Sequence, residues 1–280
     1  MNFTPLIGLA ATAAVVWIAI IQPSPKPEVL LDWRSMLLVL GGTAAVALVI
    51  FPLQKLLDLY RFVIYGVVLK KLPSVAEVAK QIVTASALGP KEYELYPLCP
   101  SSHRFLTEGY QLLAENILNE DDLREVLTRR SQYFKSNYLN DAKILATLGK
   151  FPSALGMLGS TVGLVDMMSG LSKMGQAGIG EAMALALVTT FWGLIFTYLF
   201  FMPLSDYAMR LNSEDNTLRQ LIVEGILMIK RREDPRIIVD KINGFLALQD
   251  RLVLKKSALP EDYWREAQQQ AAKVRRKKVA

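Results

Sequence analysis

Four long runs with almost no charge constrain this chain more than any other feature. Residues 2–25, 35–54 and 182–205 contain no charged side chain, and residues 151–172 contain one, Asp166. A helix needs ~20 mostly apolar residues to cross the ~30 Å hydrocarbon core of a bilayer. The sequence therefore predicts an all-α integral membrane protein with four transmembrane helices.

Other interpretations of these runs are weaker. A cleavable signal peptide would fit residues 1–21, but this segment has no basic start and no small-x-small cleavage site. Pro23, Pro25 and Pro27 set the end of the run, because proline does not continue a helix interior. Buried helices of a soluble protein are the alternative for the other runs, and the arrangement in two closely spaced pairs argues against it.

The runs divide the chain into four segments. We expect transmembrane helices 1 and 2 in residues 1–54, and transmembrane helices 3 and 4 in residues 150–206. A large helical cytoplasmic insertion, residues 55–149, separates the two pairs. Residues 207–280 form a helical cytoplasmic tail that ends in a basic cluster.

The placement of charge predicts the orientation in the membrane. Of 32 Lys and Arg residues, 13 lie in residues 52–150 and 16 in residues 207–280, whereas the two short connections hold only Lys26, Arg34 and Lys173. Basic residues near span ends stay in the cytoplasm. Both termini and the insertion are therefore expected in the cytoplasm, and the four spans in a bacterial inner membrane. Because topology accounts for the net charge of +6, we expect no nucleic-acid partner.

Helix signals mark the segments outside the membrane. Ser74 and Glu77 have the spacing of a capping box, and Asp234 and Pro235 suit the first positions of another helix. The expected helices cover residues 74–88, 105–118, 120–148 and 207–232, and the last carries an apolar stripe of Leu218, Ile222, Ile226 and Ile229.

Familiar catalytic patterns do not occur. The chain has one cysteine, Cys99, and one histidine, His103, so an intrachain disulfide is excluded and a histidine-based metal site is disfavoured. There is no phosphate-binding loop, zinc spacing or nucleophile elbow. We expect no enzymatic activity and no cofactor.

The third and fourth runs combine small residues with hydroxyls. Gly156, Gly159 and Gly163 share one helix face and permit close helix approach. Ser160 and Thr161 lie in the same run, and Thr189 and Thr190 lie in the next one. Such hydroxyls either bond back to the helix backbone, which is the commoner case, or line an ion path.

Longer stretches carry a resemblance to a known family. The segment GMLGSTVGLVDMMSGL, the following IGEAMALALVTTFWGLIFTYLFFMPLSD and the later VEGILMIKRREDPRIIVDKINGFL resemble the flagellar stator A-subunits, the MotA/PomA family of the MotA/TolQ/ExbB superfamily. LLDWRSMLLVLGGTAAVAL is similar to the family's second span, except that Arg34 replaces its proline. The resemblance covers residues 1–250.

The resemblance implies an assembly that serves bacterial motility and chemotaxis. Five copies of the A-subunit surround two copies of a MotB/PomB-like B-subunit, within membrane lipid. The B-subunit brings the aspartate that binds the travelling ion, which fits the lack of a mid-membrane acid in the third and fourth runs. Ion flow then drives torque on the flagellar rotor ring protein.

The same resemblance assigns residues to the ion pathway. It places Ser160, Thr189 and Thr190 on the path, with Thr161 beside them. Family members that use sodium tend to have hydroxyls at all three positions, so the transported cation is expected to be Na⁺ rather than H⁺.

Further residues match the family at the ends of the spans. Asp32 corresponds to an acid at the outer mouth, where it would attract cations, and it also suits the N-cap position before Ser35. Asp166 is placed at the same mouth or at the membrane edge. Pro203 matches a hinge proline, and Pro152 lies one residue from the other one.

The rotor-facing stretch departs from the family pattern. The family's Arg-x-Gly-Leu-Leu-x-Leu-Glu corresponds here to residues 79–88, in which Lys80 replaces the Arg and no acid follows. The candidate rotor contacts are Lys80, Lys91, Glu92, Glu94 and Arg104, with a merely solvated face as the alternative for each.

Two other functions stay open. The altered rotor stretch is compatible with an energiser of the same construction that drives gliding or an envelope process. A structural membrane subunit without ion flux is the second alternative.

Overall fold

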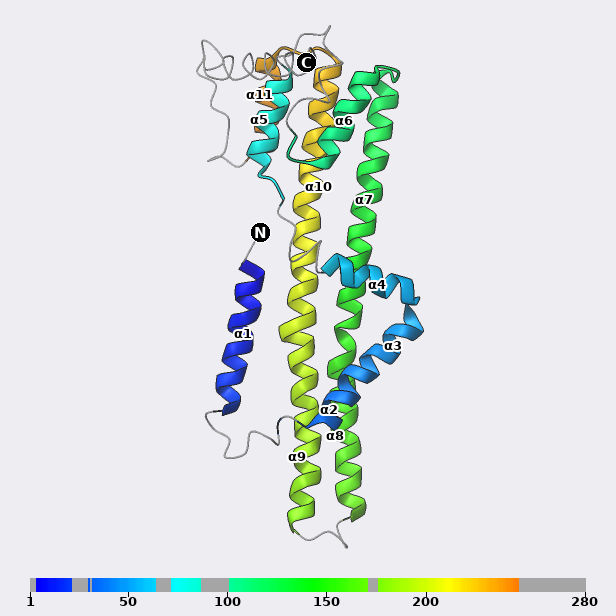
Figure 1. Cartoon of the computed structure of the whole chain (residues 1–280), viewed down its shortest axis with the longest axis vertical. Coiled ribbons are helices and arrows are strands. Elements are labelled where there is room, and N and C mark those ends of the chain that lie inside the picture. The colour runs from blue at the N-terminus through cyan, green and yellow to red at the C-terminus, as the bar shows by residue number, and fades with distance from the viewer. Residues whose placement is uncertain are drawn as a thin grey trace, which may run out of the picture. The chain divides into compact units, whose positions relative to one another are not determined.

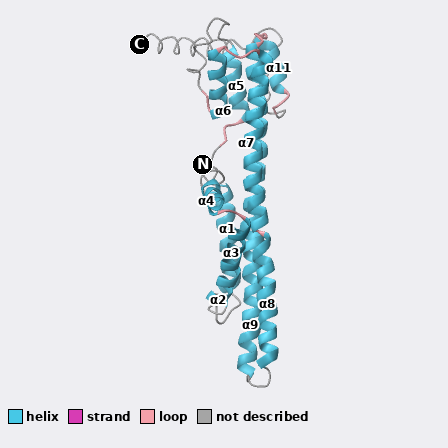
Figure 2. Ribbon diagram, turned by 90° about the vertical axis from the view of Figure 1, so that its right-hand side faces the viewer, coloured by secondary structure: helices cyan, strands magenta, loops and turns pink. Residues whose placement is uncertain are grey.

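Every regular element in the described part of the chain is a helix (Figure 2). The computed structural model describes residues 4–21, 30, 32–63, 72–86, 101–170 and 176–246. The chain forms two compact units: Met1–Lys71 with Asn137–Leu211, here called unit 1, and Leu72–Ser136 with Asn212–Ala280, called unit 2. The boundary between them falls within two long helices, α7 (Glu120–Leu148) and α10 (Met202–Lys230).

Unit 1 contains the four apolar runs. Its helices are α1 (Thr4–Ile21), α2 (Trp33–Met36), the π-helical η2 (Leu37–Gly41), α3 (Gly42–Ile50), α4 (Leu53–Arg61), α8 (Lys150–Gly170), α9 (Gln176–Leu194) and the π-helical η5 (Ile195–Phe201). The elements α2, η2 and α3 follow one another without a break, as do α9, η5 and α10.

Helices α8 and α9 lie side by side along their length, as the two ribbon views show (Figures 1 and 2). The predicted glycine face lies at their contact. A Cβ atom on Gly193 would come within 2.6 Å of the Pro152 carbonyl oxygen, and one on Gly156 within 3.0 Å of the Thr189 carbonyl oxygen. Gly163 faces Ala186 in the same way, at 2.8 Å. The close approach expected from the glycine spacing is therefore confirmed.

The surfaces of these helices are apolar. On α8, Met157, Val165 and Met168 are each 65–68% exposed, and on α3 Val49 is 86% exposed. Two described helical stretches, Trp33–Ile50 and Gly178–Lys230, are long and apolar enough to cross a membrane. The prediction of four spans stays a prediction, with α1 and α8 as its other two members.

Unit 2 packs α5 (Val75–Ser86), α6 (Arg104–Glu115) and α11 (Pro235–Asn243) around the second part of α10. The predicted stripe on α10 is confirmed, because Leu218, Ile222, Ile226 and Ile229 are all buried in its core. Two glycines allow the close packing: Gly225 faces Ile82 of α5, and Gly109 of α6 faces Ile226.

The predicted helix limits are correct at some ends and wrong at others. Helix α7 has the expected bounds, but α6 ends at Glu115 instead of residue 118, because Asn116 adopts a left-handed conformation (φ 50°). The predicted helix over 207–232 is the second part of a helix that begins at the fourth run. Asp234 caps α11 as expected, its carboxylate accepting from the Arg236 N–H at 2.8 Å.

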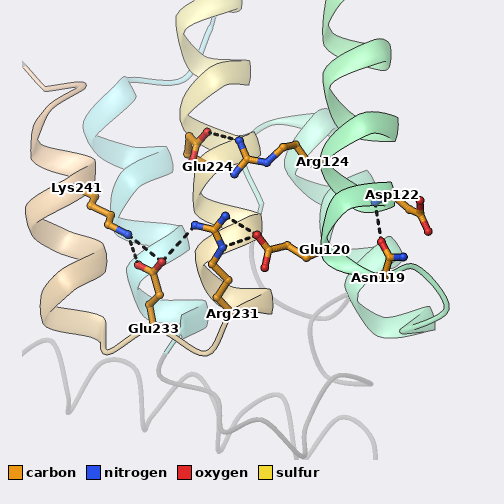
Figure 3. A network of polar contacts seen from close by, with 8 residues as sticks. All are labelled: Asn119, Glu120, Asp122, Arg124, Glu224, Arg231, Glu233 and Lys241. Atoms are coloured by element: carbon orange, nitrogen blue, oxygen red, sulfur yellow. Dashed lines mark hydrogen bonds and ion pairs between the residues drawn. The ribbon is translucent and has the colours of Figure 1, made fainter.

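An ion-pair network joins α7, α10 and α11 at one end of unit 2 (Figure 3). The Arg231 Nε atom donates to Glu120 Oε1 at 2.6 Å, and Lys241 Nζ lies 2.7 Å from Glu233. Arg231 also pairs with Glu233 at 3.6 Å, so one guanidinium connects the beginning of α7 to the turn between α10 and α11. The hydrogen bond from Arg231 lowers the pKa of Glu120 below its ordinary value.

The glycine contact predicts a sharp difference between two alanine substitutions. Gly193→Ala pushes a methyl group against the backbone of α8 and should lower stability by about 1–3 kcal/mol, the usual effect of overpacking. Gly180→Ala, on the same helix α9 but with open space around it, should lower it by less than about 0.5 kcal/mol. Thermal melts of the detergent-purified proteins by circular dichroism check this. Equal melting temperatures would contradict the packing role of Gly193.

The Glu120–Arg231 pair predicts a pH-dependent stability. Because the folded-state pKa of Glu120 is depressed, the pair stabilises unit 2 above pH 4.5, and this contribution is lost as the pH falls through the folded pKa. Glu120→Gln should therefore melt slightly earlier than the unsubstituted protein at pH 7 and together with it in acid. Glu125→Gln, whose partner Arg129 lies one turn away on α7, is the matched control. A Glu120→Gln difference that persists unchanged in acid would refute the linkage.

Candidate functional site

A largely buried polar group of unit 1 connects the start of α2 to α9. The Asp32 carboxylate caps α2, accepting from the Ser35 N–H at 3.1 Å and from its hydroxyl at 3.0 Å. The Thr189 hydroxyl lies 3.0 Å from the Ser35 hydroxyl and 2.7 Å from the Leu185 carbonyl oxygen. Three side chains from two helices thus form one chain of oxygens, running from a half-buried carboxylate to the buried Thr189.

Three helical segments enclose Thr189. Its side chain faces Gly159 of α8, where a Cβ atom would also come within 2.8 Å of Leu38 in η2. One turn further along α9, the Trp192 indole N–H donates to the Leu30 carbonyl oxygen at 2.7 Å. Leu30 and Ser35 are therefore both bonded to α9, at neighbouring residues of that helix, and this holds the oxygen chain in place.

Thr190 faces the backbone of α8. Its hydroxyl lies 3.3 Å from the carbonyl oxygens of Gly156 and of Ala186, one on each helix. The side chain is half-buried. This hydroxyl therefore lies between carbonyl groups of α8 and α9. Its oxygen keeps lone pairs that can accept a hydrogen bond or bind a cation.

The other two predicted hydroxyls lie on α8. The half-buried Ser160 donates to the Met157 carbonyl at 2.8 Å, and the exposed Thr161 donates to the Leu158 carbonyl at 2.7 Å. The structure thus does not gather the four predicted pathway hydroxyls into one cluster. Within a single chain each of them has a backbone partner on its own helix, as membrane-helix hydroxyls commonly do.

The predicted acids differ in their surroundings. Asp32 is half-buried and belongs to the oxygen chain, so its predicted helix-capping role is confirmed. Asp166 is exposed on α8, and its backbone carbonyl accepts from the Ser169 hydroxyl at 2.9 Å. Among the described residues, His, Cys, Asp and Glu form no group of three or more that could hold a metal ion.

The two predicted hinge prolines lie at different kinds of helix position. Pro152 is buried in the first turn of α8, where a missing N–H removes no helix bond. The next amide, of Ser153, donates to the Thr197 hydroxyl of η5 at 3.0 Å. Pro203 is exposed and follows η5, where the Met202 N–H reaches the Thr197 carbonyl five residues back. The hinge roles stay predictions.

The predicted rotor contacts are described only in part. Lys80 is exposed on α5, and Arg104 is 93% exposed at the start of α6, 3.5 Å from Glu108. Arg130 of α7 pairs with the same Glu108 at 3.7 Å. The other candidates, Lys91, Glu92 and Glu94, lie outside the described residues.

A buried charged group in unit 2 was missed by the sequence reasoning. His103 Nε2 lies 3.0 Å from Asp215, and the other oxygen of Asp215 accepts from Arg219 Nε at 2.8 Å. The Arg219 guanidinium lies between the rings of Phe105 and Phe134, at 4.9 and 4.4 Å from their centroids. His103 Nδ1 accepts from the Phe105 N–H, so the hydrogen of the neutral ring is on Nε2 and points to Asp215.

Sequence signals for this group were weak. The Asp215–Arg219 spacing of four residues is typical of a helix ion pair, but such pairs are usually exposed. His103 and Asp215 are 112 residues apart, so no local pattern connects them. The group supports the fold of unit 2: the imidazole caps α6 and the carboxylate neutralises a buried guanidinium.

Comparison with known proteins finds a family match over part of the chain and relatives over most of it. The description "MotA/TolQ/ExbB proton channel family" belongs to the family model that matches residues 100–220. The chemotaxis protein PomA of Vibrio alginolyticus is 26% identical over 88% of this chain and 96% of its own length. Motility protein A of Cereibacter sphaeroides is 29% identical over 92% of this chain and 100% of its own. The chain is thus similar over most of its length to proteins of the MotA/PomA family.

Two solved structures have the same fold. A chain of the C. jejuni MotAB structure aligns with a TM-score of 0.79 at 17% identity, covering 91% of this chain and 100% of that one. A chain of the flagellar MotAB stator complex from Bacillus subtilis aligns at 0.76 with 18% identity, covering 88% and 96%. The helical architecture expected from the sequence is thus shared with a chain in each of these two MotAB structures.

The buried group of unit 2 predicts a large effect of one isosteric change. Asp215→Asn leaves the Arg219 charge buried without its counter-ion, which typically destabilises by about 3–5 kcal/mol. Hydrogen exchange of the detergent-purified protein should show faster opening of α6 and of the second part of α10. The double variant Asp215→Asn with Arg219→Met removes both charges and should recover most of the protection. Unchanged exchange in Asp215→Asn would contradict the structural role.

Proposed function

We propose that this protein is the A-subunit of a cation-driven flagellar stator, in which ion flow through the inner membrane is coupled to torque on the rotor. One observation carries the proposal. Helices α8 and α9 both bear hydroxyl side chains, and the described part of α8 between Gly156 and Val165 contains no carboxylate. A cation crossing beside these helices needs an acid from another chain. Similarity to the MotA/PomA family supports a B-subunit as its source.

The proposed assembly is a pentamer around two B-subunits, with four spans per chain and both termini in the cytoplasm. The exposed apolar side chains of α3 and α8 support it, since such surfaces need lipid or a protein partner. Unit 2 carries charged side chains on α5, α6 and α7 that suit contact with a rotor protein, with Lys80 and Arg104 as the described candidates.

We also propose that the transported cation is sodium. Hard cations bind oxygen ligands when they shed water. Ser160, Thr189 and Thr190 supply such oxygens on the two helices. For protons, the carboxylate of the partner would suffice.

Two alternative functions rest on specific observations. Residues 79–86 of α5 contain the exposed Lys80 and no acid, which favours an energiser of a machine other than the flagellum. The backbone partners of all four pathway hydroxyls favour a structural subunit without ion flux.

Swimming of complemented deletion cells tests the proposal, with sodium varied at fixed pH and filaments counted by electron microscopy. Cells lacking the gene should be filamented but paralysed, and the gene should restore sodium-dependent swimming. Thr190→Val, which keeps the side-chain shape but removes an oxygen, should raise the sodium concentration for half-maximal speed about tenfold or abolish swimming. Thr147→Ala, which removes a hydroxyl that bonds back to Lys143 in α7, is the control.

The other outcomes decide between the alternatives. Rescue that is indifferent to sodium would overturn the sodium proposal in favour of protons. Normal swimming of the deletion strain would favour a non-flagellar machine. A structural subunit would be indicated by two results together. Membranes with the unsubstituted protein and with Thr190→Val would leak ions equally, and the variant would have a lower melting temperature.

A further inference from the structure

We infer that Ser35 is a positioning residue of the ion pathway, which transmits the negative charge of Asp32 to the hydroxyl oxygen of Thr189. The inference rests on the proposed function and adds to it a residue that neither motif nor comparison assigns. Ser35 is 1% exposed, and its hydroxyl lies between the Asp32 carboxylate and the Thr189 hydroxyl, 3.0 Å from each.

The number of available hydrogens limits which hydrogen bonds can form in this chain of oxygens, and in which direction. The two hydroxyls have two hydrogens to donate, and three acceptors compete for them: the Asp32 carboxylate, the partner hydroxyl and the Leu185 carbonyl oxygen. In one arrangement Ser35 donates to Asp32, and Thr189 shares its hydrogen between the Ser35 hydroxyl at 3.0 Å and the Leu185 carbonyl oxygen at 2.7 Å. In the other, Thr189 donates to the Leu185 carbonyl and accepts from Ser35.

The charge on Asp32 selects between the two arrangements. An ionised carboxylate is a stronger acceptor than a hydroxyl, because charge-assisted hydrogen bonds are about twice as strong as neutral ones. Ser35 therefore donates to Asp32, and its oxygen is left to accept from Thr189, which shares its hydrogen between Ser35 and the Leu185 carbonyl. Among the described residues, no group then donates a hydrogen bond to the Thr189 oxygen.

The same arrangement polarises Thr189. Hydrogen bonds in a chain strengthen one another, and here Thr189 donates toward Ser35 while Ser35 donates toward the carboxylate. The Thr189 oxygen becomes more negative and hence a better ligand for a cation. A carboxylate at the start of α2 thus acts on an oxygen of α9 without contacting it.

The surrounding packing keeps the chain fixed. Trp192 holds Leu30 next to α9, and Gly159 lets α8 close over Thr189. The three oxygens belong to residues whose backbones are held by helix contacts, so little rearrangement is needed when an ion passes.

A mutant cycle on sodium-dependent swimming tests the inference. Ser35→Ala removes one oxygen and should raise the sodium concentration for half-maximal speed three- to tenfold at unchanged protein level. In an Asp32→Asn background, Ser35→Ala should add less than a twofold change, because the charge to be transmitted is gone. Thr43→Val is the matched control: Thr43 is also buried in the second run, but its hydroxyl bonds only back to the Val39 carbonyl among described groups, at 2.5 Å.

Each outcome has one meaning. If Ser35→Ala matches Thr43→Val, or if its effect is equally large with and without Asp32, the transmission of charge is refuted. Melting temperatures of the purified variants identify a mere folding defect, which would lower stability without the dependence on Asp32. If the unsubstituted gene does not restore swimming at any sodium concentration, the proposed function itself fails, whatever Ser35 does.

Discussion

The close backbone contact between α8 and α9 is the constraint on which unit 1 depends. At Gly193 and Gly156 the two helices come so near that even a methyl group has no room. Without a hydrophobic driving force between helices in lipid, this contact supplies dispersion energy that larger residues would forfeit. It also brings the Thr190 hydroxyl to a carbonyl of the facing helix and leaves Thr189 free to turn toward α2. The contact between α8 and α9 therefore determines both the packing of the two helices and the positions of the Thr189 and Thr190 hydroxyls.

Unit 2 is stabilised in a different way. Its core is a cluster of mostly aliphatic residues on α5, α6, α7, α10 and α11, beside which lie one buried ion pair and one histidine. The aromatic rings beside Arg219 replace part of the hydration that the guanidinium loses on burial. Such a group contributes to the choice of one packing arrangement more than to total stability.

Sequence reasoning worked where one helix carries the signal by itself. The glycine face of α8, the apolar stripe of α10 and the caps at Asp32 and Asp234 were all predicted, because spacing along a helix determines which residues share a face. It failed where the partner is distant. Ser35 and Thr189 are 154 residues apart, and neither periodicity nor capping rules connect them. The end of α6 was misplaced because Asn116 terminates the helix through its own backbone conformation.

The π-helical η5 has a consequence for how this helix can change over evolution. A turn with one extra residue rotates everything that follows by roughly 100° about the helix axis, since an α-helix advances by that angle per residue. The α9 face that carries Thr189 and the α10 face that carries the buried Ser205 are thus offset from the register of one regular α-helix. A single-residue deletion at η5 could convert it to regular α-helix, and a relative that lost that residue would need a compensating change on one side only.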